Sequence, residues 1–159
     1  MDNSHDISHD NSRDILKLGN QLCFPLYAAS KAVVAKYAPL LSEIGLTYTQ
    51  YITMMALWEI KTIRVKELGE MLYLDSGTLT PVLKRLESKG LVARERSKTD
   101  ERAVNVRVTD SGERLKAQAA QVPLKMAECM PLSREEAGTL YGLLYKILTA
   151  NRNSRSTAK

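Results

Sequence analysis

The chain of 159 residues is 44% hydrophobic and 26% charged and carries a net charge of +5, which fits one globular domain or a small domain with additional helices. It contains no long apolar run and no signal-peptide pattern, which excludes membrane-spanning classes, and we expect a cytoplasmic protein with no membrane partner. Its two cysteines fit a reducing compartment, where thiols stay reduced.

Residues 1–14 hold four Asp and one Arg but almost no apolar side chains, which predicts a disordered N-terminal tail. His5 and His9 in this tail could share a metal ion on one helical face. A histidine pair without a further fixed ligand is a weak site, so we predict neither a metal nor another cofactor.

The region 15–46 is expected to be helical. Its apolar residues recur every three or four positions from its start to about Tyr37, which is typical of a long amphipathic helix. Pro25 predicts a kink in this helix, and Pro39 and Gly45 bracket its end.

Residues 47–109 have the order of elements of a winged helix-turn-helix domain. Thr47 and Gln50 match a capping box before an apolar helix that runs to about Ile60. A two-turn helix, a second helix and two strands of a basic hairpin follow, over 65–72, 76–89, 91–96 and 104–108. The predicted fold is therefore mainly α-helical with a small β-wing.

The helix that starts at Asp75 or Ser76 and ends at Gly90 has the features of a DNA-recognition helix. Leucines at helical spacing, with Val82, would face the core, while the other face carries short hydroxyls and two cations that can contact phosphates and base edges. The candidate DNA contacts on this helix are Ser76, Thr78, Thr80, Pro81, Lys84 and Arg85. An ordinary amphipathic helix with a solvated polar face is the alternative.

The charge around this helix also favours nucleic acid. Residues 84–107 hold eight Lys or Arg against four acids. When the helix enters the major groove, the tip of the hairpin, from Lys98 to Arg102, would reach the neighbouring minor groove or phosphates.

The sequence after Thr109 predicts one helix to about Cys129 and a break at Pro131. Ser133 and Glu136 then match a second capping box, which begins a last amphipathic helix.

The apolar stripes of the flanking regions exceed what a small winged domain needs for cover. We therefore expect residues 15–46 and 110–150 to form a dimerisation layer, with a basic C-terminal tail at residues 151–159. A two-fold homodimer would bind double-stranded DNA with a palindromic operator.

The motif Asp75-Ser-Gly-Thr-Leu-Thr-Pro-Val-Leu-Lys-Arg-Leu, with Asp100-Glu-Arg in the wing and Val108-Thr-Asp-Ser-Gly after it, resembles the MarR family of bacterial transcriptional regulators. Asn20-Gln-Leu-Cys-Phe and Leu46-Thr-Tyr-Thr-Gln-Tyr are similar to its organic hydroperoxide resistance (OhrR) branch. The resemblance covers roughly residues 15–150.

The resemblance implies that Cys23 is a peroxide-sensing cysteine. Tyr37 and Tyr48 match two tyrosines that hydrogen-bond its thiolate, and Tyr27 matches a third that moves when the cysteine is oxidised. Without the resemblance, Cys23 would be interpreted as a small core residue, because free cysteine is usually buried. The chemistry is compatible with sensing, since a thiolate attacks peroxides and the resulting sulfenic acid condenses with another thiol.

Cys129 lies where some members of the branch carry a second cysteine that forms a disulfide with the partner subunit. The alternative is a surface or interface thiol that makes mixed disulfides or does nothing. The resemblance also carries DNA contacts over to the recognition helix, and it places Arg102 in the minor groove with Asp100 holding it in position.

The sequence thus predicts a homodimeric repressor, not an enzyme, that releases its operator when an organic hydroperoxide oxidises Cys23. A MarR-type regulator released by a phenolic or lipophilic ligand, with Cys23 lining the ligand cleft, is the alternative within the DNA-binding class. A thiol peroxidase is the alternative from a different class, but the chain lacks a Cys-x-x-Cys pair, and a basic winged domain would be superfluous in such an enzyme.

Overall fold

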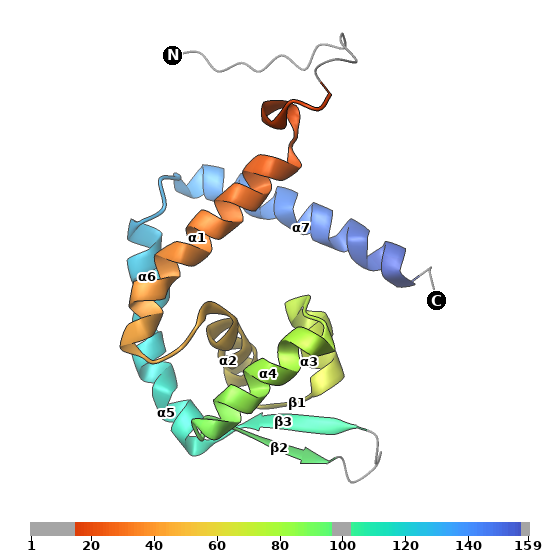
Figure 1. Cartoon of the computed structure of the whole chain (residues 1–159). Coiled ribbons are helices and arrows are strands. Elements are labelled where there is room, and N and C mark those ends of the chain that lie inside the picture. Colours follow the sequence, from red (N-terminus) through yellow and green to blue (C-terminus); the bar gives the residue numbers. More distant parts are fainter. Residues whose placement is uncertain (1–14, 97–102, 157–159) are drawn as a thin grey trace. The chain divides into compact units, whose positions relative to one another are not determined.

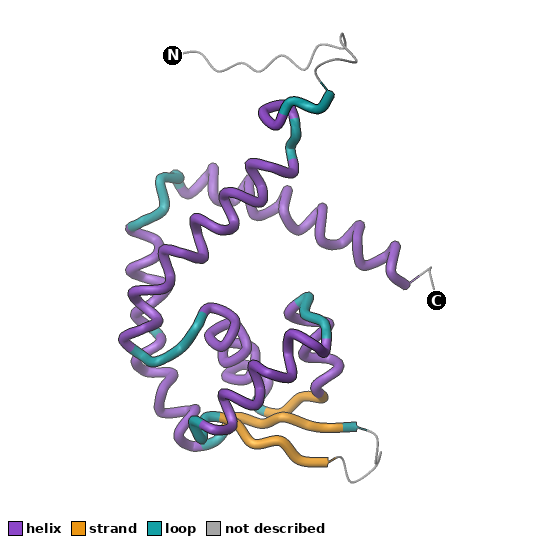
Figure 2. The backbone as a smooth tube through the Cα atoms, in the orientation of Figure 1, coloured by secondary structure: helices purple, strands orange, loops and turns teal. Residues whose placement is uncertain are grey.

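The computed structural model of the chain describes residues 15–96 and 103–156. The chain divides into two compact units, Met1–Leu124 and Lys125–Lys159, and each is described by itself. Along the chain (Figures 1 and 2) the elements are η1 (Leu18–Asn20), α1 (Cys23–Glu43), α2 (Tyr48–Ile60), β1 (Thr62–Arg64), α3 (Val65–Leu72), α4 (Ser76–Ser88), β2 (Val92–Arg96), β3 (Val104–Val108), α5 (Asp110–Ala119), α6 (Gln121–Glu128) and α7 (Arg134–Ser156). Among these described helices, none combines the length and apolar character that crossing a membrane requires.

Helix α1 begins later than the sequence predicts. The predicted helix starts at residue 15 and has a kink at Pro25, but residues 18–20 form a short 3-10 helix and α1 starts at Cys23. Pro25 therefore lies in the first turn of α1, where a backbone N–H would have no partner within the helix. The prediction of a kink is wrong because the proline helps to start the helix.

Helix α1 runs beyond Tyr37, the position at which the sequence predicts its end. It ends at Glu43, which lies between Pro39 and Gly45, the two residues predicted to bracket its end. The turn that follows has Gly45 at φ +67°, a left-handed conformation that glycine adopts readily. The N–H of Leu46 donates to the carbonyl of Leu41 at 2.9 Å, which closes the end of the helix.

Helices α3 and α4 form the predicted helix-turn-helix, and α2 contacts both of them. The N–H of Thr47 donates to Oε1 of Gln50 at 3.2 Å, so the capping box at the start of α2 is confirmed. The inner face of α4 consists of Leu79, Leu83 and Leu86, each no more than 1% exposed. The helical spacing of these leucines therefore predicts the buried face of α4 correctly.

Strand β3 is the centre of a three-stranded antiparallel sheet with the order β1-β3-β2. Strands β2 and β3 are the predicted hairpin, with Val92 opposite Val108. The sequence leaves residues 62–64 unassigned, but they form β1, in which Ile63 lies opposite the fully buried Val106. Strand β1, which directly precedes α3, therefore attaches the hairpin to the helical core.

The single helix predicted from Thr109 to Cys129 is wrong in its continuity, because the structure has α5 and α6 with a break at Ala120. Pro123 accounts for the break. It has no N–H to donate to the carbonyl of Ala119, and its ring would collide with that carbonyl in a continuous helix.

In the second unit, α7 begins at the predicted capping box. The N–H of Ser133 donates to Oε2 of Glu136 at 2.8 Å, and the N–H of Glu136 donates to Oγ of Ser133 at 3.2 Å. These bonds hold the pKa of Glu136 below its ordinary value. Helix α7 runs to Ser156. Residues 151–156, which the sequence predicts as tail, are therefore helical.

Candidate functional site

The N-terminus of α4 is fixed by a local carboxylate. Asp75 is the N-cap residue, and its Oδ1 accepts the N–H of Thr78 at 2.9 Å. Its Oδ2 accepts the hydroxyl of the same threonine, also at 2.9 Å. These bonds lower the pKa of Asp75 below its ordinary value, first through the backbone N–H and then through the hydroxyl. Because the Thr78 hydroxyl donates to the carboxylate, its lone pairs remain available to accept.

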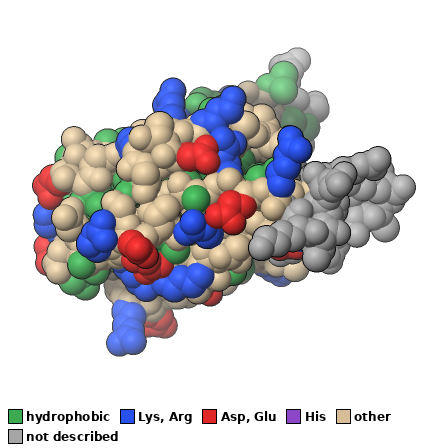
Figure 3. Space-filling view, turned by 90° about the horizontal axis from the view of Figure 1, so that it is seen from below, with side chains coloured by type: hydrophobic (Ala, Val, Ile, Leu, Met, Phe, Trp, Pro, Cys, Tyr) green, Lys and Arg blue, Asp and Glu red, His purple; other side chains and the backbone are tan. Residues whose placement is uncertain are grey.

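The outer face of α4 is open to solvent. Thr80 is half-buried, and the other predicted contacts on this helix are exposed, namely Ser76, Thr78, Pro81, Lys84 and Arg85. Figure 3 views the molecule from the side on which Figure 1 draws the strands, and Lys and Arg side chains are spread over this face among Asp and Glu. The predicted wing contacts Lys98, Asp100 and Arg102 lie outside the described residues.

Two ion pairs hold the hairpin in place. Arg94 donates from Nε to Oε2 of Glu87 at 2.9 Å, which ties β2 to the last turns of α4. The hydrogen bonds from Arg94 lower the pKa of Glu87. Arg107 on β3 donates to Oε1 of Glu95 on β2 at 2.9 Å. The sequence alone does not predict these pairs, because each joins residues that only the folded hairpin brings together.

Cys23 is the first residue of α1, and its side chain is exposed. Tyr27 follows one turn later and is 60% exposed. The ammonium of Lys31 lies 5.2 Å from the centre of the Tyr27 ring, a cation–π distance. The start of α1 therefore presents a thiol and an aromatic ring on an open surface.

Three tyrosines form a cluster where α1 crosses α2, and this group is called the tyrosine cluster below. The ring centres of Tyr37 and Tyr48 are 5.0 Å apart, and those of Tyr37 and Tyr51 are 6.0 Å apart. The resemblance of the sequence predicts Tyr37 and Tyr48 as site residues but does not indicate Tyr51. The signal for Tyr51 was its spacing of three from Tyr48, which places both rings on one face of a helix.

Burial raises the pKa of both Tyr37 and Tyr51 above the ordinary value of 10.0, and the neighbouring phenols add to the rise. These two phenols are therefore protonated at neutral pH. Each is able to donate a hydrogen bond to an acceptor that reaches it.

The structure does not bring Cys23 and Tyr37 of one chain together. The two residues lie fourteen positions apart on the single helix α1, which corresponds to about 21 Å along its axis. Tyr48 and Tyr51 pack against Tyr37. The tyrosine cluster is therefore out of hydrogen-bonding reach of the Cys23 thiol in the same chain.

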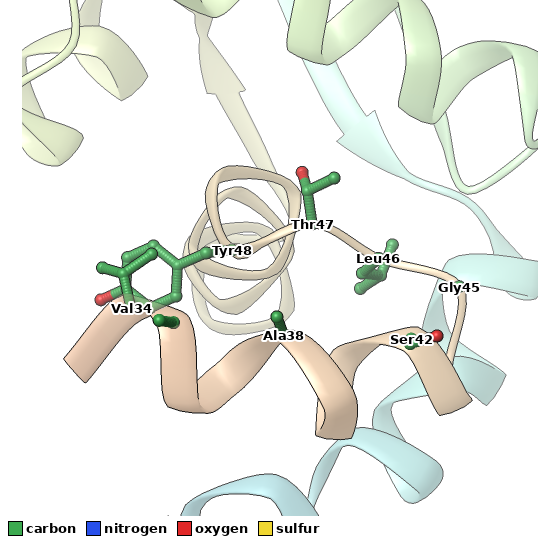
Figure 4. Close-up of a pocket in the computed structure, with 8 residues that line it drawn as sticks. Val34, Ala38, Ser42, Gly45, Leu46, Thr47 and Tyr48 are labelled. Atoms are coloured by element: carbon green, nitrogen blue, oxygen red, sulfur yellow. The ribbon is translucent and has the colours of Figure 1, made fainter. Parts of the chain in front are cut away.

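A largely apolar pocket of about 530 Å³ lies beside the tyrosine cluster (Figure 4). Its walls come from α1, from the loop between α1 and α2, and from the start of α2. The residues that line it are Val34, Ala35, Ala38, Ser42, Gly45, Leu46, Thr47 and Tyr48. The pocket thus shares Tyr48 with the tyrosine cluster.

Cys129 belongs to the second unit and directly follows α6. Its thiol is exposed. Helix α7 carries a row of exposed apolar residues, including Tyr141 at 62% and Leu143 at 55%. The rings of Tyr141 and Tyr145 lie 4.5 Å apart on this surface.

The described residues contain no group of three or more His, Cys, Asp or Glu that could hold a metal ion. His5 and His9, the pair weighed as metal ligands, lie outside those residues.

Comparison with known proteins identifies transcriptional regulators as similar to this chain. The family model described as transcriptional regulator SarA/Rot matches residues 35–119. The organic hydroperoxide resistance transcriptional regulator of Bacillus subtilis is 46% identical over 139 residues, covering 87% of this chain and 95% of that protein.

Solved structures of AbfR, a protein of Staphylococcus epidermidis, are also similar. Reduced AbfR bound to DNA is 31% identical with a TM-score of 0.76, covering 90% of this chain and 98% of that one. Disulfide-formed AbfR is 33% identical with a TM-score of 0.58, covering 90% and 96%.

Proposed function

Because the chain belongs to the MarR-type winged-helix transcriptional regulators and to their organic hydroperoxide resistance branch, we propose that it is a homodimeric repressor that an organic hydroperoxide releases from DNA by oxidising Cys23. It is a regulator and not an enzyme. The observation that carries the proposal is the exposed thiol of Cys23 on the same helix as Tyr37, whose phenol stays protonated and lies out of reach of the thiol of the same chain.

DNA binding is assigned to α4 and the wing. The exposed first turn of α4 presents hydroxyls, and the Thr78 hydroxyl, which donates to Asp75, can accept a hydrogen bond from an exocyclic amine of a base. Lys84 and Arg85 would reach the DNA backbone or guanine from further along the helix. Arg102 is proposed to enter the minor groove with Asp100 beside it. The structure of reduced AbfR bound to DNA, a similar protein, supports DNA binding by this fold.

A second copy of the chain is needed to complete the redox site. The segment that precedes α1 exposes Leu16 at 92% and Leu22 at 77%, and exposed apolar surface of this extent is typical of a protein interface. In a two-fold dimer every contact occurs twice, so the start of one α1 can meet the tyrosine cluster of the other chain. The exposed row on α7 would add to the same dimerisation layer. Residues 15–46 and 110–150 are proposed to build that layer.

In such a dimer, the tyrosines of the partner would donate hydrogen bonds to the Cys23 thiolate and stabilise it. The thiolate attacks one oxygen of the hydroperoxide, the O–O bond breaks, and the alkoxide leaves and takes a proton to become the alcohol. The product is a sulfenic acid on Cys23. The Tyr27 ring, one turn along α1, is proposed to move with the oxidised cysteine.

Cys129 of the partner subunit is proposed to resolve the sulfenic acid. Its thiolate would attack the sulfenic sulfur, an S–S bond would form, and the hydroxyl would leave as water after protonation. The disulfide-formed state of AbfR is an observation on a similar protein that supports this step. The intersubunit bond would pull α1 and the tyrosine cluster out of position and change the spacing of the two recognition helices.

The test is fluorescence anisotropy with a labelled duplex that the reduced protein has selected from a random library. Reduced protein is bound to the duplex, titrated with cumene hydroperoxide and then treated with dithiothreitol. We expect release at about one equivalent of peroxide per subunit and recovery with dithiothreitol, while the Cys23→Ser variant stays bound. Wild-type protein that peroxide cannot release would contradict the proposal.

Release by a small phenolic or lipophilic ligand is the second candidate. The apolar pocket beside Tyr48 favours it, because its volume of about 530 Å³ is adequate for a small organic molecule. The Cys23→Ser variant distinguishes the two functions. A ligand-released regulator would respond to its ligand with or without the thiol, whereas a peroxide-released one would be fixed on the DNA.

A further inference from the structure

Lys89 joins the recognition helix to the loop between α1 and α2. It is the C-cap residue of α4. Its ammonium donates to the carbonyl oxygen of Gly45 at 2.5 Å and to Oε1 of Gln50 at 3.2 Å. One flexible side chain therefore holds the end of α4, the end of the α1 turn and the first turn of α2.

Gln50 couples the Lys89 contact to the position of Thr47. Its side chain is buried, with the residue only 3% exposed, and its Oε1 accepts the N–H of Thr47 at 3.2 Å as well as the ammonium of Lys89. A carbonyl oxygen has two lone pairs, and these two donors use both. Any displacement of Thr47 therefore changes the acceptor that holds Lys89.

The same loop belongs to the tyrosine cluster and its pocket. Thr47 directly precedes Tyr48, whose ring lies 5.0 Å from that of Tyr37. Gly45, Thr47 and Tyr48 all line the pocket. A path of one peptide bond and two hydrogen bonds thus leads from the tyrosine cluster to the C-terminal end of α4.

We propose that Lys89 is the positioning residue through which a change at the tyrosine cluster reaches the recognition helix. This inference rests on the proposed function, because that function supplies the signal, the oxidation of Cys23. The contact of Lys89 with the loop between α1 and α2 does not depend on that function. The leucines of α4 fix its depth in the core, and Glu87 ties it to the wing. Lys89 fixes α4 to the loop that the tyrosine cluster would move.

The experiment is a double-mutant cycle on DNA affinity, run on the full chain under reducing conditions with the selected duplex. Tyr48→Ala is introduced into wild type, Lys89→Met and Lys116→Met. Lys89→Met removes the ammonium but keeps much of the side-chain length. Lys116→Met is the matched control, because this exposed lysine on α5 has the same charge. Lys89→Arg, which keeps donors for both oxygens, tests rescue.

We expect Tyr48→Ala to weaken DNA binding about tenfold in the wild-type, Lys89→Arg and Lys116→Met backgrounds. In the Lys89→Met background, the same substitution should weaken DNA binding less than about threefold. Equal effects in all backgrounds would overturn the inference, because a purely structural role of Lys89 gives additive losses. An unchanged affinity of Tyr48→Ala in wild type would overturn it as well. If thermal melting shows that Tyr48→Ala is unfolded, Tyr48→Phe takes its place under the same criteria.

The cycle separates this inference from the proposed function. It involves no oxidation, so non-additivity would support the Lys89 link even if peroxide failed to release wild-type protein from DNA. If wild type is released by cumene hydroperoxide, Lys89→Met should need more peroxide or keep a larger bound fraction than Lys116→Met. Release of Lys89→Met indistinguishable from that of Lys116→Met would count against the link.

Discussion

The indole Nε1 of Trp58 donates a buried hydrogen bond to the carbonyl oxygen of Gly112 at 2.8 Å, which ties α2 to the first turn of α5. Gly112 also has no room for a side chain. A Cβ at this position would lie 2.2 Å from the carbonyl oxygen of Leu91 and 2.7 Å from Cγ2 of Val108. The glycine of the Val108-Thr-Asp-Ser-Gly motif is therefore a packing requirement of the winged domain.

Gly112→Ala should destabilise the protein, because a backbone oxygen cannot move away from the new methyl group without disturbing the wing. We expect a loss of about 1–3 kcal/mol in the free energy of unfolding, as for overpacked cores. Urea denaturation followed by circular dichroism measures it. Gly138→Ala on α7 is the control, since nothing lies within 4 Å of its Cβ position, and it should leave stability unchanged or slightly higher. Equal stability of the two variants would show that the close contacts at Gly112 relax freely.

Trp58→Phe tests the hydrogen bond that Trp58 donates to Gly112, and it should also destabilise the protein. An aromatic ring is retained, although it is smaller than the indole, and the carbonyl of Gly112 loses its donor in a buried position. Leaving a buried acceptor unsatisfied costs about 1–3 kcal/mol. The same denaturation experiment measures the loss, and a stability equal to that of wild type would mean that water or another donor replaces the indole.

The Asp75 carboxylate predicts a pH dependence of stability. Its hydrogen bonds to Thr78 lower its pKa in the folded state below the ordinary value of 3.8. The stabilising contribution is therefore fully present above pH 3.8 and is lost as the pH falls through the lower folded pKa. Wild type should be more stable than Asp75→Ala at neutral pH, and the difference should narrow in acid. A difference that grows on acidification would mean that Asp75 does not act as a charged cap.

Capping signals predict where helices begin because they act within one turn. Asp75 before α4, and Ser133 with Glu136 before α7, satisfy backbone groups three residues away, so the sequence contains the whole interaction. The same locality explains the correct inner face of α4. The sequence does not predict strand β1, because its three residues are stabilised by pairing with β3, more than forty residues further along the chain.

The arrangement of the candidate redox site also depends on the folded structure. The resemblance identifies Cys23, Tyr37 and Tyr48 as site residues, but the distance between them depends on where α1 starts and how far it runs. A chain that kinked at Pro25 would have allowed a different geometry. Because Pro25 lies in the first turn and α1 is a single helix, the thiol and the tyrosine cluster are held apart within one chain.

Lys84 on the outer face of α4 should contribute to DNA affinity mainly through charge. We expect Lys84→Ala to weaken binding to specific and random duplexes alike, and to reduce the slope of log affinity against log salt by about one. Lys116→Ala on α5 is the charge-matched control and should keep the slope. The measurement is anisotropy at several salt concentrations. Identical slopes for the two variants would place Lys84 away from the DNA.

The approximately 21 Å between Cys23 and Tyr37 along α1 predicts that each redox site is shared between two chains. A heterodimer of one Cys23→Ser chain and one Tyr37→Phe/Tyr48→Phe chain would then keep one complete site, because the intact thiol faces intact tyrosines. A heterodimer of wild type with a chain carrying all three substitutions would keep none. If the site lay within one chain, the first heterodimer would be defective and the second would keep one site.

Differently tagged chains, co-expressed and purified through both tags, provide these heterodimers. Stopped-flow measurement of cumene hydroperoxide consumption then gives the rate and amplitude of thiol oxidation. A shared site predicts the wild-type rate with half the wild-type amplitude for the first heterodimer and a slow reaction for the second. The opposite result would show that Cys23 meets its own tyrosines, and it would require α1 to break between residues 23 and 37 in solution.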